Sequence, residues 1–313
     1  MGYTYVIGTR PEAIKLAPLI LELPGTVVLT GQHPTMAREA LAQFGITPYT
    51  DLRGSGEIPT HQAIISQGDT RSVLDAATAA YTAGVPFIHI EAGLRSGDLS
   101  KPWPEEGYRR MVAQIASWHF CPTERAAGNL RAENVPGEVR VVGNTIIDAL
   151  RLVNPPKSQS IDLLVTMHRR EAIGEQMRSV MEQVASLGRR VVVMTHPNPS
   201  VAAIIAEHFP GAQAPLPYRE FLSLLASARV VLTDSGGLQE ECAYLGIPVL
   251  VTREATERQE GVEAGCARLV GFADIAAQVR RLDDPAEYRL MSEAACPYGD
   301  GFAAQRIRDA LCA

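Results

Sequence analysis

The stretch of residues 229–252 constrains the fold most, because it combines strand, turn, helix and strand signals in unbroken order. Residues 230–232 form an apolar run of the length of a buried parallel strand, and a polar turn with two glycines follows. Residues 238–245 have helical spacing, and a second apolar run occupies 249–251. This order predicts a βαβ unit with parallel strands.

The turn that opens this helix has the residues of an anion site. Ser235 stands at the expected N-cap, while Gly236 and Gly237 let an anion approach backbone N–H groups that the helix dipole makes positive. Glu240 and Glu241 follow one turn later, with carboxylates that can accept ribose hydroxyls. The turn alone fits two interpretations equally: a diphosphate seat, or a βα turn whose glycines serve only packing.

The same alternation extends along the chain and predicts an α/β fold with open parallel sheets and helices on both faces. Further strands are expected at residues 3–7, 27–29, 63–66, 85–90, 118–121, 139–142, 163–166 and 191–195. Helices are expected between them, among others at 36–44, 174–187, 201–209 and 218–227.

A chain of 313 residues suggests two domains. The proline-rich polar segment 154–160 is the predicted linker. We expect an N-terminal Rossmann-like domain at 1–153 and a second one at 161–295. A terminal helix at 302–311, within the tail 296–313, is expected to pack back on the first domain.

Composition narrows the class of partner. The net charge of −6 provides no general attraction for nucleic acid or a membrane surface, and no apolar run reaches membrane-spanning length. The N-terminus begins as a strand, and the five cysteines are an odd number without CxxC spacing. We therefore expect a cytoplasmic protein with reduced thiols.

Polar residues gather where the predicted strands end, and in open parallel sheets functional groups lie at that edge. These residues are Thr9, Arg10, Gln32, His33, Asp69, Thr70, Glu91, His168, His196, Asp234 and Ser235.

These strand-end residues belong to motifs that follow one another in order along nearly the whole chain. They include GTRPEAIKLAPL (8–19), GQH (31–33), GDT (68–70), HIEAGLRSGD (89–98), PWPEE (102–106), GNTIIDAL (143–150), HRRE (168–171), HPNP (196–199), LTDSGGLQEE (232–241), TER (256–258) and PYGDG (297–301). The set closely resembles the non-hydrolysing UDP-N-acetylglucosamine 2-epimerase family. The resemblance implies two Rossmann-like domains in a GT-B arrangement, with an active-site cleft between the domains.

The resemblance implies a cofactor-free and metal-free reaction that interconverts UDP-N-acetylglucosamine and UDP-N-acetylmannosamine, for surface polysaccharide synthesis. A base removes the C2 proton as UDP leaves C1, and UDP adds back after C2 is protonated on the other face. The C2 proton is weakly acidic, so positioned carboxylates are required, and cationic and N–H donors must stabilise the UDP.

By this resemblance the catalytic group consists of Asp69, Glu91 and Glu105, with Lys15 and His168, and no face of C2 is assigned to any one carboxylate. Each carboxylate also has a structural interpretation. Asp69 alone would cap the following helix, Glu91 ends an apolar strand where a charge needs a partner, and Glu105 alone is a solvated loop residue. We expect Lys15 to pair with a catalytic carboxylate.

Binding residues carried over from the family form a second set, which holds UDP and sugar: Arg10, Arg109, His196, Ser235, Gly236, Gly237, Glu241 and Arg258. Gln32 and His33 match positions of a second, activating UDP-sugar site in bacterial members. The alternatives are a solvated helix end for Arg10 and Lys15, and a structural histidine for His196. No spacing supports a metal at His168 or His196.

The chain departs from the family pattern at several places. Residues 51–60 stand where members usually carry a longer loop and a helix. Position 35 is a threonine and does not have the polar residue that is usual in the activating site. Tyr108, Met167 and Gln259 replace an asparagine, a glycine and a proline.

Three other functions remain open from the sequence. They are a GT-B glycosyltransferase with the same UDP seat, a hydrolysing epimerase that releases free N-acetylmannosamine, and a silent UDP-sugar-binding regulator. Homodimerisation is implied by the family alone.

Overall fold

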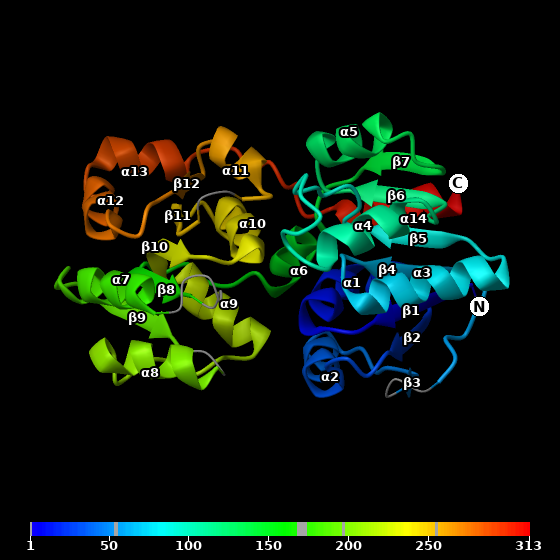
Figure 1. The fold of residues 1–313 in the computed structure, drawn as a ribbon, viewed down its shortest axis with the longest axis horizontal. Helices are drawn as coiled ribbons and strands as arrows, with labels where there is room; N and C mark the ends of the chain where they lie inside the picture. The colour runs from blue at the N-terminus through cyan, green and yellow to red at the C-terminus, as the bar shows by residue number, and fades with distance from the viewer. Residues whose placement is uncertain (1, 53–55, 168–173, 196–197, 254–255) are drawn as a thin grey trace. The chain divides into compact units, whose positions relative to one another are not determined.

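The chain folds into two compact units, each with its own parallel sheet (Figure 1). The computed structural model describes residues 2–313 except 53–55, 168–173, 196–197 and 254–255. The first unit consists of Met1–Leu152 with Tyr298–Ala313, and the second of Val153–Pro297. The predicted α/β class with two parallel sheets is confirmed.

The first unit contains a seven-stranded sheet in which the described strand pairs are all parallel. In spatial order its strands are β3 (Thr50–Asp51), β2 (Thr26–Leu29), β1 (Tyr3–Ile7), β4 (Ala63–Gln67), β5 (Phe87–Ile90), β6 (Trp118–Cys121) and β7 (Glu138–Val141). The chain turns from one half of the sheet to the other between β1 and β4. At such a switch point the loops diverge and leave room for a ligand.

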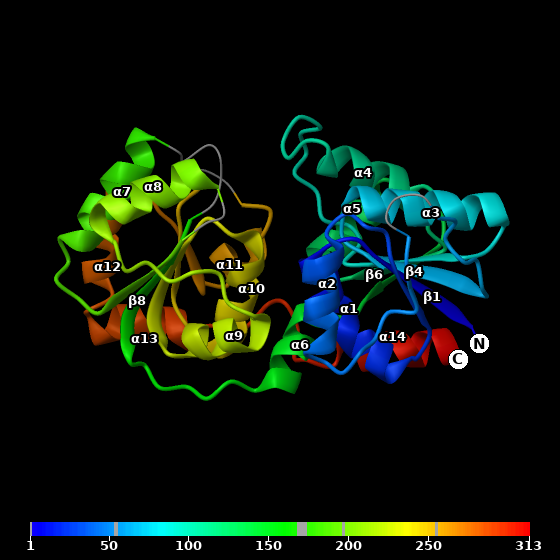
Figure 2. The ribbon, with the colours of Figure 1, turned by 90° about the horizontal axis from the view of Figure 1, so that it is seen from below.

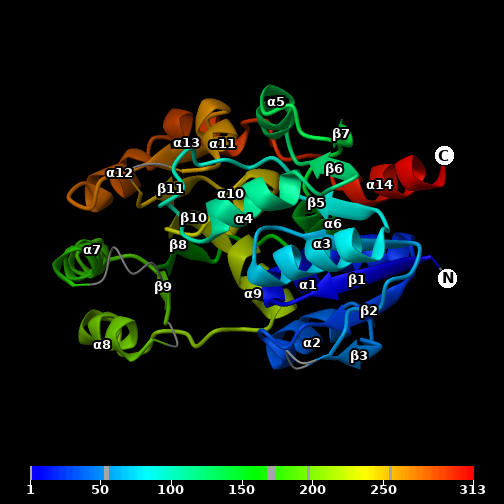
Figure 3. The same cartoon turned by 45° about the vertical axis from the view of Figure 1, so that its right-hand side comes forward.

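Helices cover both faces of this sheet. They are α1 (Arg10–Glu22), α2 (Pro34–Ala42), α3 (Arg71–Ala83), α4 (Glu105–Ala113), α5 (Glu124–Ala132), α6 (Thr145–Val153) and α14 (Ala303–Cys312). Helices α3 and α4 lie side by side on one face (Figure 3), while α1, α2 and α14 pack on the other (Figure 2). Residues Tyr298–Ala313 of the predicted tail therefore belong to the first unit, whereas Cys296 and Pro297 belong to the second.

Helix α3 shows why these segments fold as they do. Its buried residues Val73, Ala76, Ala77 and Ala80 recur at helical spacing and form one apolar stripe. The stripe packs in one core cluster with residues of the sheet and of α4, Ile64 among them. Small alanines at three of the four positions let the helix approach the sheet closely.

The second unit contains a five-stranded sheet. In spatial order its strands are β12 (Ala267–Leu269), β11 (Val249–Val251), β10 (Ala228–Thr233), β8 (Ile161–Thr166) and β9 (Val191–Met194). Its helices are α7 (Glu175–Ala185), α8 (Pro199–His208), α9 (Tyr218–Ala226), α10 (Gly236–Leu245), α11 (Gln259–Glu263), α12 (Ile275–Arg281) and α13 (Pro285–Ser292). The predicted βαβ unit is β10–α10–β11, with Val231 paired in parallel to Val249.

Several elements were not predicted from the sequence. Strand β3 has two residues, and β12, α11, α12 and α13 lie in a region to which no pattern was assigned. Short elements contain too few repeats for their periodicity to be recognised. None of the described helices is long and apolar enough to cross a membrane.

Candidate active site

Two of the residues predicted for catalysis, Asp69 and Glu91, follow the neighbouring strands β4 and β5, and β4 borders the switch point of the first unit. Gln67 of β4 pairs with Ile90 of β5, and the Gly68 N–H donates to the Ile90 carbonyl at 3.1 Å. Asp69 and Glu91 therefore start from adjacent backbone positions. Arg10 opens α1 just after β1, the other strand of the switch point, and is partly exposed.

Glu91 is held by two donors from distant parts of the chain. Lys15 of α1, only 7% exposed, forms an ion pair with Glu91 Oε2. The side-chain amide of Asn144 donates to the same oxygen at 3.1 Å. A nearly buried lysine requires such a partner, because desolvation of a lone ammonium is costly. The predicted pairing of Lys15 with a carboxylate is present in the structure.

The backbone of Glu91 adopts a left-handed conformation, with φ of 63°. Residues other than glycine seldom adopt it, and such strain is concentrated at functional sites. The conformation turns the chain sharply at the end of β5. This turn brings the carboxylate to Lys15 rather than continuing the strand.

Asp69 and Glu106 share Arg109. The Arg109 Nη2–Asp69 Oδ2 distance is 2.6 Å, and Nη1 lies 3.1 Å from Glu106 Oε2. Glu106 has no exposed surface. Burial raises the pKa of Glu106, but the Ser96 N–H and the Arg109 guanidinium outweigh burial and lower the pKa below its usual value.

The structural alternative for Asp69 is wrong. Thr70 occupies the cap position of α3, and Asp69 instead accepts hydrogen bonds from Arg109. Capping of α3 therefore does not explain why an aspartate stands at position 69.

Glu105 is the first residue of α4, not a loop residue as expected. Pro104 precedes it, and a carboxylate in the first turn is favoured by the helix dipole. Glu105 and Arg109 are four residues apart, so they share one face of α4. Glu105 is partly exposed, unlike its buried neighbour Glu106.

Two buried residues hold the turns of this site in place and were not singled out from the sequence. The Glu12 carboxylate accepts the Gly8 N–H at 2.6 Å and the Thr9 and Thr70 hydroxyls at 2.9 and 2.7 Å. Burial raises the pKa of Glu12, against these hydrogen bonds. A carboxylate in the first turn after a glycine was the available sequence signal. The Glu12 carboxylate joins the loops that carry Arg10 and Asp69.

The second is His89, whose Nε2–H donates to the Gly68 carbonyl across 2.7 Å. His89 is 2% exposed, and burial lowers its pKa to about 4, so the imidazole is neutral near pH 7. It ties the end of β5, two residues before Glu91, to the residue before Asp69.

The residues expected at an activating site lie beside the Gly8 turn. The Ser72 hydroxyl donates to Gln32 Oε1 at 2.8 Å, and the His33 N–H donates to the Gly8 carbonyl at 2.8 Å. The Gln32 side chain thus supports the loop at the end of β2. The His33 side chain is exposed.

In the second unit, the predicted glycine turn opens α10 at the switch point between β8 and β10. Ser235 occupies the N-cap position as predicted, but its side chain makes no capping hydrogen bond. The Ser235 N–H donates to the Thr233 hydroxyl at 3.0 Å. A side chain at Gly237 would meet nothing within 4 Å, so open space adjoins the first turn.

Arg258 lies beside Gly236, as the sequence suggested. A side-chain carbon at Gly236 would lie 3.1 Å from Arg258 Nη1 and 2.9 Å from Glu257 Oε1. Arg258 is 7% exposed, and its guanidinium donates to Glu240 Oε1 at 3.1 Å and to Glu257 Oε1 at 2.8 Å. The helix N-terminus thus has an ordered cation next to it, an arrangement suited to a diphosphate.

Glu241 accepts a hydrogen bond from the Tyr218 hydroxyl at 2.9 Å, and both side chains are buried. Tyr218 is the first residue of α9, and nothing in its local sequence indicated this contact. His168 and His196, the remaining predicted site residues, lie outside the described residues.

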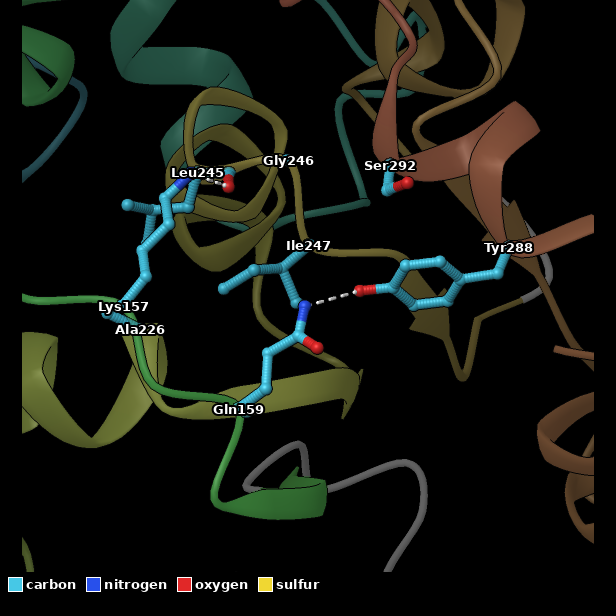
Figure 4. Close-up of a pocket in the computed structure, with 9 residues that line it drawn as sticks. Lys157, Gln159, Ala226, Leu245, Gly246, Ile247, Tyr288 and Ser292 are labelled. Atoms are coloured by element: carbon cyan, nitrogen blue, oxygen red, sulfur yellow. Dashed lines mark hydrogen bonds between the residues drawn. The ribbon is translucent and has the colours of Figure 1, made fainter. Parts of the chain in front are cut away.

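A pocket of the second unit lies at the opposite edge of the sheet, at the amino ends of β8, β10 and β11 (Figure 4). Lys157 donates to the Leu245 carbonyl at 2.6 Å, and Gln159 donates to the Tyr288 hydroxyl at 3.2 Å. These contacts fasten the predicted linker to the second unit. The pocket contains none of the predicted site residues.

The fold and the two sites define an α/β enzyme of the GT-B class, with carboxylates in one Rossmann-like unit and a glycine turn in the other. The sequence profile of UDP-N-acetylglucosamine 2-epimerase matches residues 21–312. The chain belongs to this family.

Relatives support the assignment along the whole chain. The UDP-N-acetylglucosamine 2-epimerase of Yersinia pestis is 38% identical, over 98% of this chain and 97% of its own. The crystal structure of the Neisseria meningitidis enzyme bound to UDP-GlcNAc has a TM-score of 0.90 at 34% identity, with complete coverage of both chains. The Methanocaldococcus jannaschii enzyme in complex with UDP-GlcNAc and UDP has a TM-score of 0.83 at 28% identity, over 100% and 99% of the chains.

The alignment with the Yersinia protein spans 364 positions, more than the 313 residues of this chain. The relative therefore carries segments that this chain lacks.

Proposed function

We propose that this protein interconverts UDP-N-acetylglucosamine and UDP-N-acetylmannosamine by inverting C2 of the sugar. The C2–H bond breaks as UDP leaves C1 with the bonding electrons, which gives a glycal with a C1–C2 double bond. UDP then adds back to C1 while C2 takes a proton on the opposite face. The product would supply N-acetylmannosamine units for surface polysaccharides.

The observation that carries the proposal is the pairing of buried cations with carboxylates at adjacent strand ends, Lys15 with Glu91 and Arg109 with Asp69. Acid and base groups for opposite faces of C2 must be placed within bonding reach of one carbon, and adjacent strand ends supply such placement. Glu105 and His168 complete the proposed catalytic set. His168 is included because it lies in the HRRE motif (168–171), which matches the family.

The glycine turn of the second unit is the proposed seat of the leaving group. The Ser235 hydroxyl and the backbone N–H groups of Gly236 and Gly237 would donate to the diphosphate, with Arg258 beside them and Glu241 toward the ribose. The Neisseria complex with UDP-GlcNAc and the Methanocaldococcus complex with UDP-GlcNAc and UDP support this ligand class. Arg10, Arg109 and His196 are proposed to contact phosphate or sugar.

The test is turnover of UDP-N-acetylglucosamine in D2O followed by NMR. We expect deuterium at C2 and the appearance of UDP-N-acetylmannosamine. Free N-acetylmannosamine with accumulating UDP would instead identify a hydrolysing enzyme. Binding without any exchange would contradict the proposal.

Glu91→Gln is expected to abolish exchange and leave UDP affinity nearly unchanged, because the amide cannot take the C2 proton. Glu133→Gln is the matched control, since Glu133 also accepts from an arginine, Arg95, whose side chain is 7% exposed, but lies outside the proposed site. The control should retain exchange. Wild-type turnover in Glu91→Gln would remove Glu91 from the catalytic set.

A further inference from the structure

Asn144 is a buried residue that links the proposed base to the segment where the chain leaves the first unit. It directly precedes α6, and the chain passes to the second unit at the end of that helix. The chain returns at Tyr298. Asn144 is 2% exposed, so its polar groups need partners within the protein.

Each described polar group of Asn144 has a different partner. Its Nδ2 donates to Glu91 Oε2 at 3.1 Å, while its Oδ1 accepts the Ile146 N–H at 3.2 Å and so caps α6. Its backbone N–H donates to the Tyr298 carbonyl at 2.8 Å. One residue therefore contacts the carboxylate, the helix and the returning chain.

Two glycines permit the close approach of the returning chain. Gly143 and Gly299 have φ of 96° and 117°, and a side-chain carbon at Gly143 would lie 3.3 Å from the Gly299 Cα. Any larger residue at either position would separate the two backbones. The approach brings the Tyr298 carbonyl within reach of Asn144.

Helix α6 is fastened to the returning chain along its length. Asp148 accepts the N–H groups of Ala303 and Ala304 at 3.1 and 2.8 Å, which caps α14. Arg151 donates to the Gly301 carbonyl at 2.8 Å. These bonds attach α6 to α14 and to the returning chain, whereas the backbone of Asn144 is held by its own bond to Tyr298.

Both described donors to Glu91 meet the same oxygen. Lys15 approaches Oε2 from α1, and Asn144 approaches it from the start of α6. Two donors from different elements restrict rotation of the carboxylate more than either does alone. The charge of Lys15 supplies attraction, whereas the amide of Asn144 supplies direction.

We propose that Asn144 is a positioning residue, which fixes the orientation of the Glu91 carboxylate toward the substrate without touching the substrate itself. The inference rests on the proposed role of Glu91 as an acid or base at C2. A misplacement of about 1 Å in a catalytic group can cost about 100-fold in rate. Loss of Asn144 is therefore expected to reduce kcat and leave substrate binding unchanged.

Two substitutions separate this role from helix capping. Asn144→Ser keeps a capping oxygen and the backbone bond to Tyr298 but is too short to reach Glu91. Asn144→Asp keeps the cap and the size, and presents an oxygen to Glu91 in place of an N–H. We expect kcat, measured by deuterium exchange at C2, to fall about 10- to 100-fold in both variants, with KM and UDP affinity within about 2-fold of wild type.

Asp148→Asn is the control, because it weakens the attachment of α14 without contacting Glu91. It should lower the melting temperature and retain kcat. Wild-type kcat in Asn144→Ser would overturn the proposal, and so would an equal loss of kcat in Asp148→Asn. An inactive wild-type protein would instead contradict the proposed function, so the two failures are distinguishable.

Discussion

At the scale of single residues, the buried charges of the first unit are arranged in pairs and chains. Arg109 stands between Asp69 and Glu106, and the two carboxylates differ in exposure. Glu106 is inside the protein, whereas the Asp69 side chain is 27% exposed. The arginine thus neutralises a structural carboxylate and also directs its Nε and Nη2 groups to a proposed catalytic one.

Arg109→Met is expected to destabilise the fold by about 3–5 kcal/mol, because it leaves the buried Glu106 carboxylate without its closest charged partner. Urea denaturation at pH 7 measures the loss. Arg110→Gln is the matched control: its side chain is 44% exposed and lies 3.3 Å from Glu106, so the expected cost is below about 1 kcal/mol. Equal losses in both variants would refute this account.

At the scale of elements, helix α10 is held at both ends by residues of different kinds. Its first turn carries the glycines of the proposed UDP seat. At its end, Gly246 adopts φ of 67°, and Lys157 donates to the Leu245 carbonyl. A left-handed residue and a nearby ammonium both satisfy the last carbonyl groups of a helix.

Gly246→Ala should destabilise the second unit more than Gly188→Ala. Both glycines have left-handed backbones, with φ of 67° and 62°, and an alanine there costs about 1–2 kcal/mol. Only at Gly246 would the added carbon also lie 2.8 Å from a backbone carbonyl oxygen, that of Ser292. The expected difference is about 1–3 kcal/mol in urea unfolding. Equal urea midpoints for the two variants would show that the backbone at Ser292 moves away from the added carbon at little cost.

The elements themselves were largely predictable. Strands at residues 3–7 and 118–121 have the predicted bounds, and the βαβ unit at the centre of the second sheet is where the sequence placed it. Continuous apolar runs produce strong local signals, because parallel strands are buried on both faces. The elements that were not predicted, such as β12 and α13, are short or have a weak apolar pattern.

At the scale of the whole molecule, buried titratable groups make stability depend on pH. Burial lowers the pKa of His89 to about 4, whereas an unfolded histidine titrates near 6.5. Between about pH 6.5 and 4 the unfolded chain therefore binds a proton that the folded chain does not. The stability that His89 contributes is present above that window and is lost as the pH falls through it.

His89→Gln is expected to make the free energy of unfolding less sensitive to pH between 7 and 5, by up to about 1.4 kcal/mol per pH unit. Urea unfolding at several pH values measures the slope. A slope that is the same in the His89 variant would assign the pH dependence to other groups.

The sequence by itself determined which side chains reach the carboxyl edge of each sheet. A polar residue directly after an apolar run must lie there, since all strands of these sheets run in parallel. Asp69, Glu91 and Ser235 could be placed in this way. The ordered motifs around them identified the family before any tertiary contact was known.

Only the tertiary structure decided which groups meet. Lys15 and Glu91 are 76 residues apart, Asp69 and Arg109 are 40 apart, and Glu91 and Asn144 are 53 apart. Such partners depend on how helices pack on the sheet and where the chain returns, and local spacing carries no record of either. The partners of the buried glutamate at position 12 and of the asparagine at 144 could not be predicted for the same reason: they come from distant loops that packing brings together.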